Sequence, residues 1–185
     1  GVPGAFMSMI GYEILNEIIN VWEITTSNEI LAQMHMGIKK ALKQDETHNR
    51  DGMDLALCVI DKQQQQLQFS GAMNPLIYLQ NDNLLEIKGD KMGIGGVDAR
   101  EHIFTQHLID MSVPTTFYLF TDGYEDQFGG ENNQKFKKKN LKQLLHTIHH
   151  QSMDAQQYTL ETTMEQWRGT QKQIDDILVI GVRLQ

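Results

Sequence analysis

The sequence of 185 residues has little cysteine and no long hydrophobic run. Its single cysteine, Cys58, lies inside the apolar run "LALCVI". One cysteine cannot form a disulfide within the chain, and such a residue is typical of a small buried side chain in a reducing cytoplasm. No apolar run approaches the roughly 20 residues that span a bilayer, and no signal peptide is evident. We therefore predict a cytoplasmic domain, and an upstream membrane-anchored sensor segment stays open.

Positive charge and nucleophile motifs are also scarce. The sequence has 24 acidic and 16 basic residues, which give a net charge of −8. This balance argues against nucleic acid or an anionic membrane as the main partner. There is no Gly-x-Ser-x-Gly motif, and Cys58 has no evident activating base, so covalent catalysis is not indicated. With 40% hydrophobic and 22% charged residues, we expect one globular domain over residues 1–185.

Hydrophobic periodicity changes twice along the sequence, from helical to strand-like and back. The helical pattern covers residues 6–19, 25–44, 140–151 and 154–169. Strand-length apolar runs cover residues 53–60, 66–71, 76–80, 83–89, 102–109, 116–121 and 176–184. Short turns such as "NDN" join these runs, which favours antiparallel pairing over parallel units with crossover helices. The pattern predicts an α+β domain.

Acidic residues stand at the ends of two of the predicted strands. Asp122 directly follows the run "TFYLFT", and Gly123 comes next; Asp175 and Asp176 lie just before the last run, "ILVIGVRL". If these strands are antiparallel neighbours, the three carboxylates converge at one edge of the core. Converging carboxylates repel one another unless cations lie between them, and oxygen ligands suit Mg²⁺ or Mn²⁺. Turn formation by Asp-Gly is the more frequent explanation for each site taken alone.

Two other features have a structural explanation at least as good as a functional one. The opening "GVPGA" could bind an anion at a helix N-terminus, or it could be a tight packing turn. His146, His149 and His150 share one helix face, a spacing that could bind a transition metal. No cysteine or acidic residue lies near them in the sequence, so we expect a solvated helix face.

Six segments, in their order along the chain, carry a resemblance to a known family. They are "GVPGAFMSMIG", "DGMDLALCVID", "FSGAMNPLIYL", "KMGIGG", "YLFTDGYEDQFGG" and "DDILVIGVRL". Together they resemble the PPM-type metal-dependent serine/threonine phosphatases, in particular the bacterial SpoIIE/RsbU-like branch. Two departures, Gly93 in place of a usual proline and "SVPTT" before a strand, fall in expected loops.

The resemblance implies an αββα fold, in which an antiparallel β-sandwich is flanked by helix pairs. It implies a binuclear Mn²⁺ or Mg²⁺ centre with Asp122 and Asp175 as ligands and Asp176 as a weaker candidate. Gly123 would allow a tight backbone beside the metal, and Gly1 matches the last glycine of a Gly-His-Gly motif. Metal-activated water would attack phosphoserine or phosphothreonine, so no further catalytic side chain is expected.

In that family a bridging aspartate and the first strands lie upstream of the position of Gly1. We therefore expect an N-terminally incomplete domain that is inactive or nearly so by itself, with an exposed sheet edge that favours a homodimer. The resemblance further implies a phosphorylated regulatory protein as substrate, such as an anti-sigma-factor antagonist, and an upstream sensor domain. The alternative is a non-catalytic interaction module of the same fold.

Overall fold

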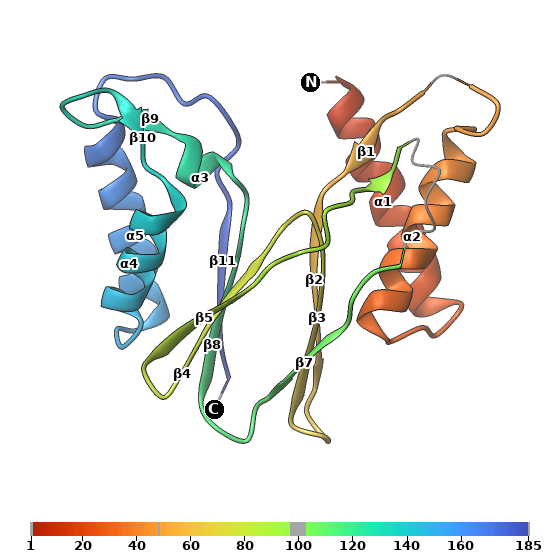
Figure 1. Cartoon of the computed structure of the whole chain (residues 1–185), viewed down its shortest axis with the longest axis horizontal. Coiled ribbons are helices and arrows are strands. Elements are labelled where there is room, and N and C mark those ends of the chain that lie inside the picture. The colour runs from red at the N-terminus through yellow and green to blue at the C-terminus, as the bar shows by residue number, and fades with distance from the viewer. Residues whose placement is uncertain (1, 48, 97–102, 185) are drawn as a thin grey trace. The chain divides into compact units, whose positions relative to one another are not determined.

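The computed structural model describes residues 2–47, 49–96 and 103–184, and the chain forms two units (Figure 1). Unit 1 consists of residues 1–75 and 88–112, and unit 2 of residues 76–87 and 113–185. The chain therefore contributes one hairpin to unit 2 before it returns to complete unit 1. None of the helices in the described ranges is long and apolar enough to cross a membrane.

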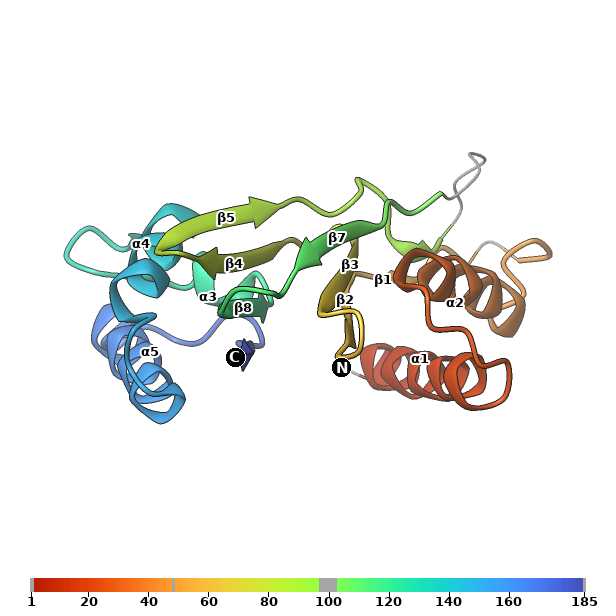
Figure 2. The same cartoon turned by 90° about the horizontal axis from the view of Figure 1, so that it is seen from below.

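Unit 1 is a helix pair packed on an antiparallel sheet. Its elements are α1 (Val2–Asn20), α2 (Ser27–Ala41), β1 (Gly52–Met53), β2 (Leu55–Asp61), β3 (Gln66–Ala72), β6 (Ile94–Gly95) and β7 (His107–Asp110). The strand order is β2-β3-β7, and β1 pairs with β6. Figure 2 shows α1 and α2 side by side. Their apolar positions, spaced at helical intervals, are buried in one core that includes Ile18, Ile30, Met34 and Ile38.

Unit 2 likewise packs a helix pair on an antiparallel sheet, which is wider than the sheet of unit 1. Its elements are β4 (Leu76–Gln80), β5 (Asn83–Ile87), β8 (Thr115–Phe120), α3 (Gly123–Asp126), β9 (Phe128–Gly129), β10 (Gln134–Lys135), α4 (Lys138–Ile148), α5 (Met153–Arg168) and β11 (Val179–Leu184). The antiparallel strand order is β11-β8-β4-β5. Leu141, Leu145 and Leu160 of α4 and α5 share a core with Ile77 and Tyr118 of the sheet. The predicted α+β class with antiparallel pairing is confirmed.

The opening segment differs from its prediction as a turn. Helix α1 already begins at Val2, so Pro3 lies in the first helical turn, where its missing N–H costs no hydrogen bond. Gly4 is exposed, and no other group lies within 4 Å of the place where a Cβ would stand. Gly1, the supporting residue named from the resemblance, lies outside the described residues.

The strand predicted over 102–109, of which residue 102 lies outside the described residues, is shorter than expected, since β7 begins only at His107. Before it, the carboxylate of Asp90 accepts hydrogen bonds from the backbone N–H and the hydroxyl of Thr105, at 2.7 and 2.9 Å. The Asp90 side chain therefore accepts the backbone N–H of Thr105, which the prediction had assigned to a strand partner. Alternation of apolar residues does not reveal such local competition.

Candidate metal centre

The ends of β8 and β11 meet at one place in unit 2. The two strands are antiparallel neighbours, with Phe120 opposite Val179, and the N–H of Thr121 extends the ladder by donating to the carbonyl of Leu178 at 3.1 Å. The condition on which the sequence argument depended is therefore confirmed. The residue after β8 lies beside the segment that leads into β11.

Two small residues, Thr121 and Gly123, fix this junction. The hydroxyl of Thr121 donates to the carbonyl of Asp176 at 2.8 Å and accepts from the N–H of Leu178 at 3.0 Å. Gly123 approaches the same carbonyl so closely that an added Cβ would lie 2.3 Å from the Asp176 oxygen. The chain beside Asp122 therefore contacts the Asp175–Asp176 segment directly, and it does so through backbone that only glycine permits.

The three predicted ligands are exposed and little used by the rest of the fold. Asp122 stands at the N-cap position of α3, yet its side chain caps no N–H. The carboxylate of Asp175 accepts a local bond, from the N–H of Asp176 to its Oδ1 at 2.8 Å. In the described ranges these carboxylates do not form a group whose oxygens all lie within 4.8 Å of one another. The structure thus brings the two segments together at the level of the backbone.

A fourth carboxylate, Glu125, lies one turn along α3 from Asp122. Its Oε2 is buried without a hydrogen-bond partner among the described residues, while Oε1 lies 3.9 Å from Nζ of Lys138. Burial raises the pKa of Glu125, the Lys138 cation opposes this shift, and nearby carboxylates including Asp122 add to it. The surplus of oxygen donors at this turn fits a hard divalent cation such as Mg²⁺ or Mn²⁺.

Sequence reasoning missed the anchoring residues of this turn. The hydroxyl of buried Tyr124 donates to the carbonyl of Leu160 in α5 at 2.8 Å, and burial raises the pKa of this tyrosine. Gln127, also buried, donates from Nε2 to the carbonyl of Lys172 at 3.0 Å. These bonds join α3 to α5 and to the loop before β11. The only sequence signal was a buried-type tyrosine next to the Asp-Gly pair.

Solved structures that share this fold include two PP2C domains. The SiaA-PP2C domain of Pseudomonas aeruginosa is 27% identical, with a TM-score of 0.88 over all of this chain and 72% of that chain. A structure of the PP2C phosphatase domain of SpoIIE from Bacillus subtilis, with a fragment of its regulatory domain, is 18% identical, with a TM-score of 0.68 over 97% of this chain and 50% of that chain. RsbX in complex with magnesium is 12% identical, with a TM-score of 0.63 over 95% and 73% of the two chains.

The fold and the family match together define the class of this protein: it is a PP2C-type, metal-dependent protein phosphatase domain. The family model described as Stage II sporulation protein E (SpoIIE) matches residues 1–185. The chain belongs to this family of protein serine/threonine phosphatases, which confirms the resemblance drawn from the six segments. No curated protein matches the chain.

Proposed function

We propose that the protein hydrolyses phosphoserine or phosphothreonine on a regulatory protein, with two Mn²⁺ or Mg²⁺ ions bound at the β8–β11 junction. Asp122 and Asp175 are the proposed ligands, and Asp176 is the weaker candidate. The observation that carries this proposal is the shared contact of Thr121 and Gly123 with the carbonyl of Asp176. Thr121 and Asp176 lie 55 positions apart in sequence, and exposed carboxylates flank their contact on both segments.

The residues of the chain supply placement and charge. Bound divalent cations polarise a phosphate ester and lower the pKa of a water molecule. Thr121 and Gly123 fix the backbone on both sides of Asp122, so only its side chain has to reorient to accept a cation. Among the described residues no cap bond engages the side chain of Asp122, and its carboxylate oxygens suit a hard cation. No nucleophilic side chain is required.

The ligand set proposed here is short of oxygens for two ions. The resemblance implies a further bridging aspartate upstream of the position of Gly1, and we propose that residues 1–185 alone bind two cations poorly. Carboxylates that converge without such a bridge also repel one another. A longer protein that includes the preceding segment is the form in which we expect activity.

The partners are proposed on the same resemblance. We propose a phosphorylated regulator such as an anti-sigma-factor antagonist as substrate, an upstream sensor domain and a cytoplasmic place of action. A homodimer is a further proposal, since β11 and β5 are the outer strands of the unit 2 sheet in the described residues.

Phosphate release from a small aryl phosphate ester in the presence of Mn²⁺ tests the proposal. Asp122→Asn in the longer protein should lower the rate at least about a hundredfold, more than the loss of an outer partner of a metal ligand. The matched control is Glu131→Gln, an exposed carboxylate in the turn between β9 and β10 that is no proposed ligand.

Each outcome separates two explanations. Activity that Asp122→Asn removes and Glu131→Gln leaves intact supports the metal assignment. Activity that survives Asp122→Asn means that other residues hold the metal. If neither the longer protein nor residues 1–185 releases phosphate, the non-catalytic interaction module becomes the better reading of the fold.

A further inference from the structure

The turn between β4 and β5 presents an aspartate to the end of α4, a contact that the β8–β11 junction does not use. Gln80 lies opposite Asn83, so the hairpin loop consists of Asn81 and Asp82 alone. Both have positive φ, 48° and 61°, as in a type I′ turn. Such a turn is tight, and it therefore holds the Asp82 side chain in a defined direction.

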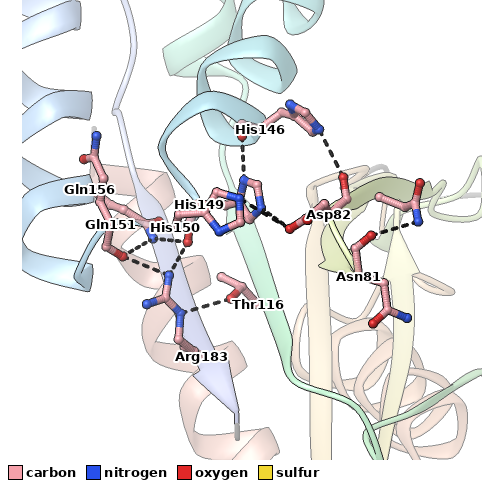
Figure 3. A network of polar contacts seen from close by, with 10 residues as sticks. Asn81, Asp82, Thr116, His146, His149, His150, Gln151, Gln156 and Arg183 are labelled. Atoms are coloured by element: carbon pink, nitrogen blue, oxygen red, sulfur yellow. Dashed lines mark hydrogen bonds and ion pairs between the residues drawn. The ribbon is translucent and has the colours of Figure 1, made fainter.

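Two imidazoles face that aspartate (Figure 3). The Oδ1 of Asp82 lies 3.1 Å from Nε2 of His149 and 3.3 Å from Nε2 of His150, and the three atoms all lie within 4.8 Å of one another. Zinc bonds of about 2.0–2.1 Å at tetrahedral angles place ligand atoms about 3.3–3.5 Å apart. The expected solvated helix face is wrong for His149, whose side chain is only 10% exposed.

The ring of His149 is oriented by its other nitrogen. Its Nδ1 contacts the carbonyl of His146, which can only accept, so Nδ1 carries the proton. Nε2 is then turned toward a carboxylate oxygen, and a cation, either a proton or a metal ion, has to lie between the two atoms. His146 in turn donates from Nε2 to the carbonyl of Asp82 at 3.1 Å. The contact of the His149 ring N–H with a backbone carbonyl is the outer contact that metal-binding histidines usually have.

The backbone that carries the two imidazoles is fixed by hydrogen bonds from the side chains of Arg183 and Gln156. The carbonyl of His149 accepts from Nη2 of Arg183 and from Nε2 of Gln156, the latter at 3.1 Å. The carbonyl of Gln151 accepts from the same two side chains, at 2.9 and 3.0 Å. The charge of Arg183 is thus taken up by carbonyls that follow α4. A rigid support of this kind reduces the entropy lost when a ligand is bound.

We propose that Asp82, His149 and His150 form a binding site for a divalent transition-metal ion, with Zn²⁺ as the preferred occupant, separate from the carboxylate site at the β8–β11 junction. Two imidazoles and one carboxylate are typical of zinc, copper or nickel rather than of magnesium. The site lies at the C-terminal end of α4, where the helix dipole favours a cation.

The surroundings leave room for the remaining coordination positions. Asp82 and His150 are 73% and 70% exposed, and a cavity of about 360 Å³ adjoins them. Water molecules complete the coordination sphere in a site with three protein ligands. This inference does not depend on the proposed phosphatase mechanism.

Zn²⁺ binding to residues 1–185 tests the proposal by competition with a chromophoric chelator. Asp122→Asn and Asp175→Asn are introduced first, so that zinc binding at the β8–β11 junction does not obscure the result. We expect one equivalent of Zn²⁺ to bind, and His150→Gln to weaken binding at least tenfold. His146→Gln, which removes the side-chain bond to the carbonyl of the ligand Asp82, should weaken it by about tenfold without loss of stoichiometry.

The matched control is His107→Gln in β7, a histidine of unit 1 that stacks on Phe69 with ring centroids 6.2 Å apart. It should leave the zinc affinity unchanged. A parent protein that binds no Zn²⁺ more tightly than millimolar, or a His150→Gln variant that binds it as the parent does, overturns the proposal. Because His150 is exposed, its substitution leaves the fold intact, and circular dichroism checks this.

Discussion

At the scale of single residues, Gly123 is the position where the β8–β11 junction tolerates least. A Cβ there would lie 2.3 Å from the carbonyl oxygen of Asp176 and 2.9 Å from its carbon, so the backbone itself would have to move. We predict that Gly123→Ala lowers the free energy of unfolding by about 1–3 kcal/mol, the usual cost of overpacking. Urea denaturation measures this change.

Gly4→Ala is the matched control for that prediction. Gly4 lies in α1, and nothing stands within 4 Å of the added methyl group. Alanine is a better helix former than glycine, so this variant should be neutral or more stable by up to about 1 kcal/mol. If Gly123→Ala is as stable as Gly4→Ala, the close contact with Asp176 is not a property of the folded protein.

At the scale of elements, one buried hydrogen bond joins β8 to α5. The hydroxyl of Tyr118 donates to Oε1 of Gln156 at 2.6 Å, and the two side chains are each 1% exposed. We predict that Tyr118→Phe costs about 1–3 kcal/mol of stability, because it leaves a buried amide oxygen without its donor. The variant should also loosen the Gln156 bonds under His149.

The same tyrosine predicts how stability changes in alkali. Burial raises the pKa of Tyr118 to about 12, and the Arg183 cation opposes this shift only in part. The unfolded chain releases the phenolic proton near pH 10, so the contribution is complete below about pH 10 and is lost as the pH rises toward 12. Between these two pH values the free energy of unfolding falls by about 1.4 kcal/mol per pH unit. Urea unfolding between pH 9 and 11.5 should show a shallower slope for Tyr118→Phe, and equal slopes would contradict the prediction.

The elements also show what a sequence can and cannot predict. Period and strand length placed β3, β4 and β8 within a residue or two, because each buries alternate or continuous apolar positions against one core. The proximity of Asp122 and Asp176 followed from the hypothesis that their two strands are antiparallel neighbours, and the register of β8 and β11 confirms it. The contact of Asp82 with His149 could not be predicted. It joins residues 67 positions apart in sequence. The sequence around Asp82 predicts a turn and carries no signal of a partner in α4.

At the scale of the whole molecule, unit 2 is assembled from two separate stretches of chain. β8 is an inner strand between β11 and β4, and β4 belongs to the stretch 76–87. Ile77 and Leu79 of β4 are 0% and 3% exposed in the core of this unit. Residues 113–185 alone would lack these core side chains and would expose the edge of β8 that pairs with β4. We predict that this fragment shows no cooperative urea transition.

Joining the hairpin 76–87 to residue 113 through a flexible linker should restore folding. Gln80 lies opposite Thr115, so the linker has to run back along β4, whose five residues span about 16 Å. About ten Gly/Ser residues have a mean reach of about 17 Å. The linked protein should unfold cooperatively and, since Asp82, His149 and His150 all belong to unit 2, should bind Zn²⁺ as the whole chain does. A cooperative transition in 113–185 alone would show that α4 and α5 packed on β8 and β11 already form a sufficient core.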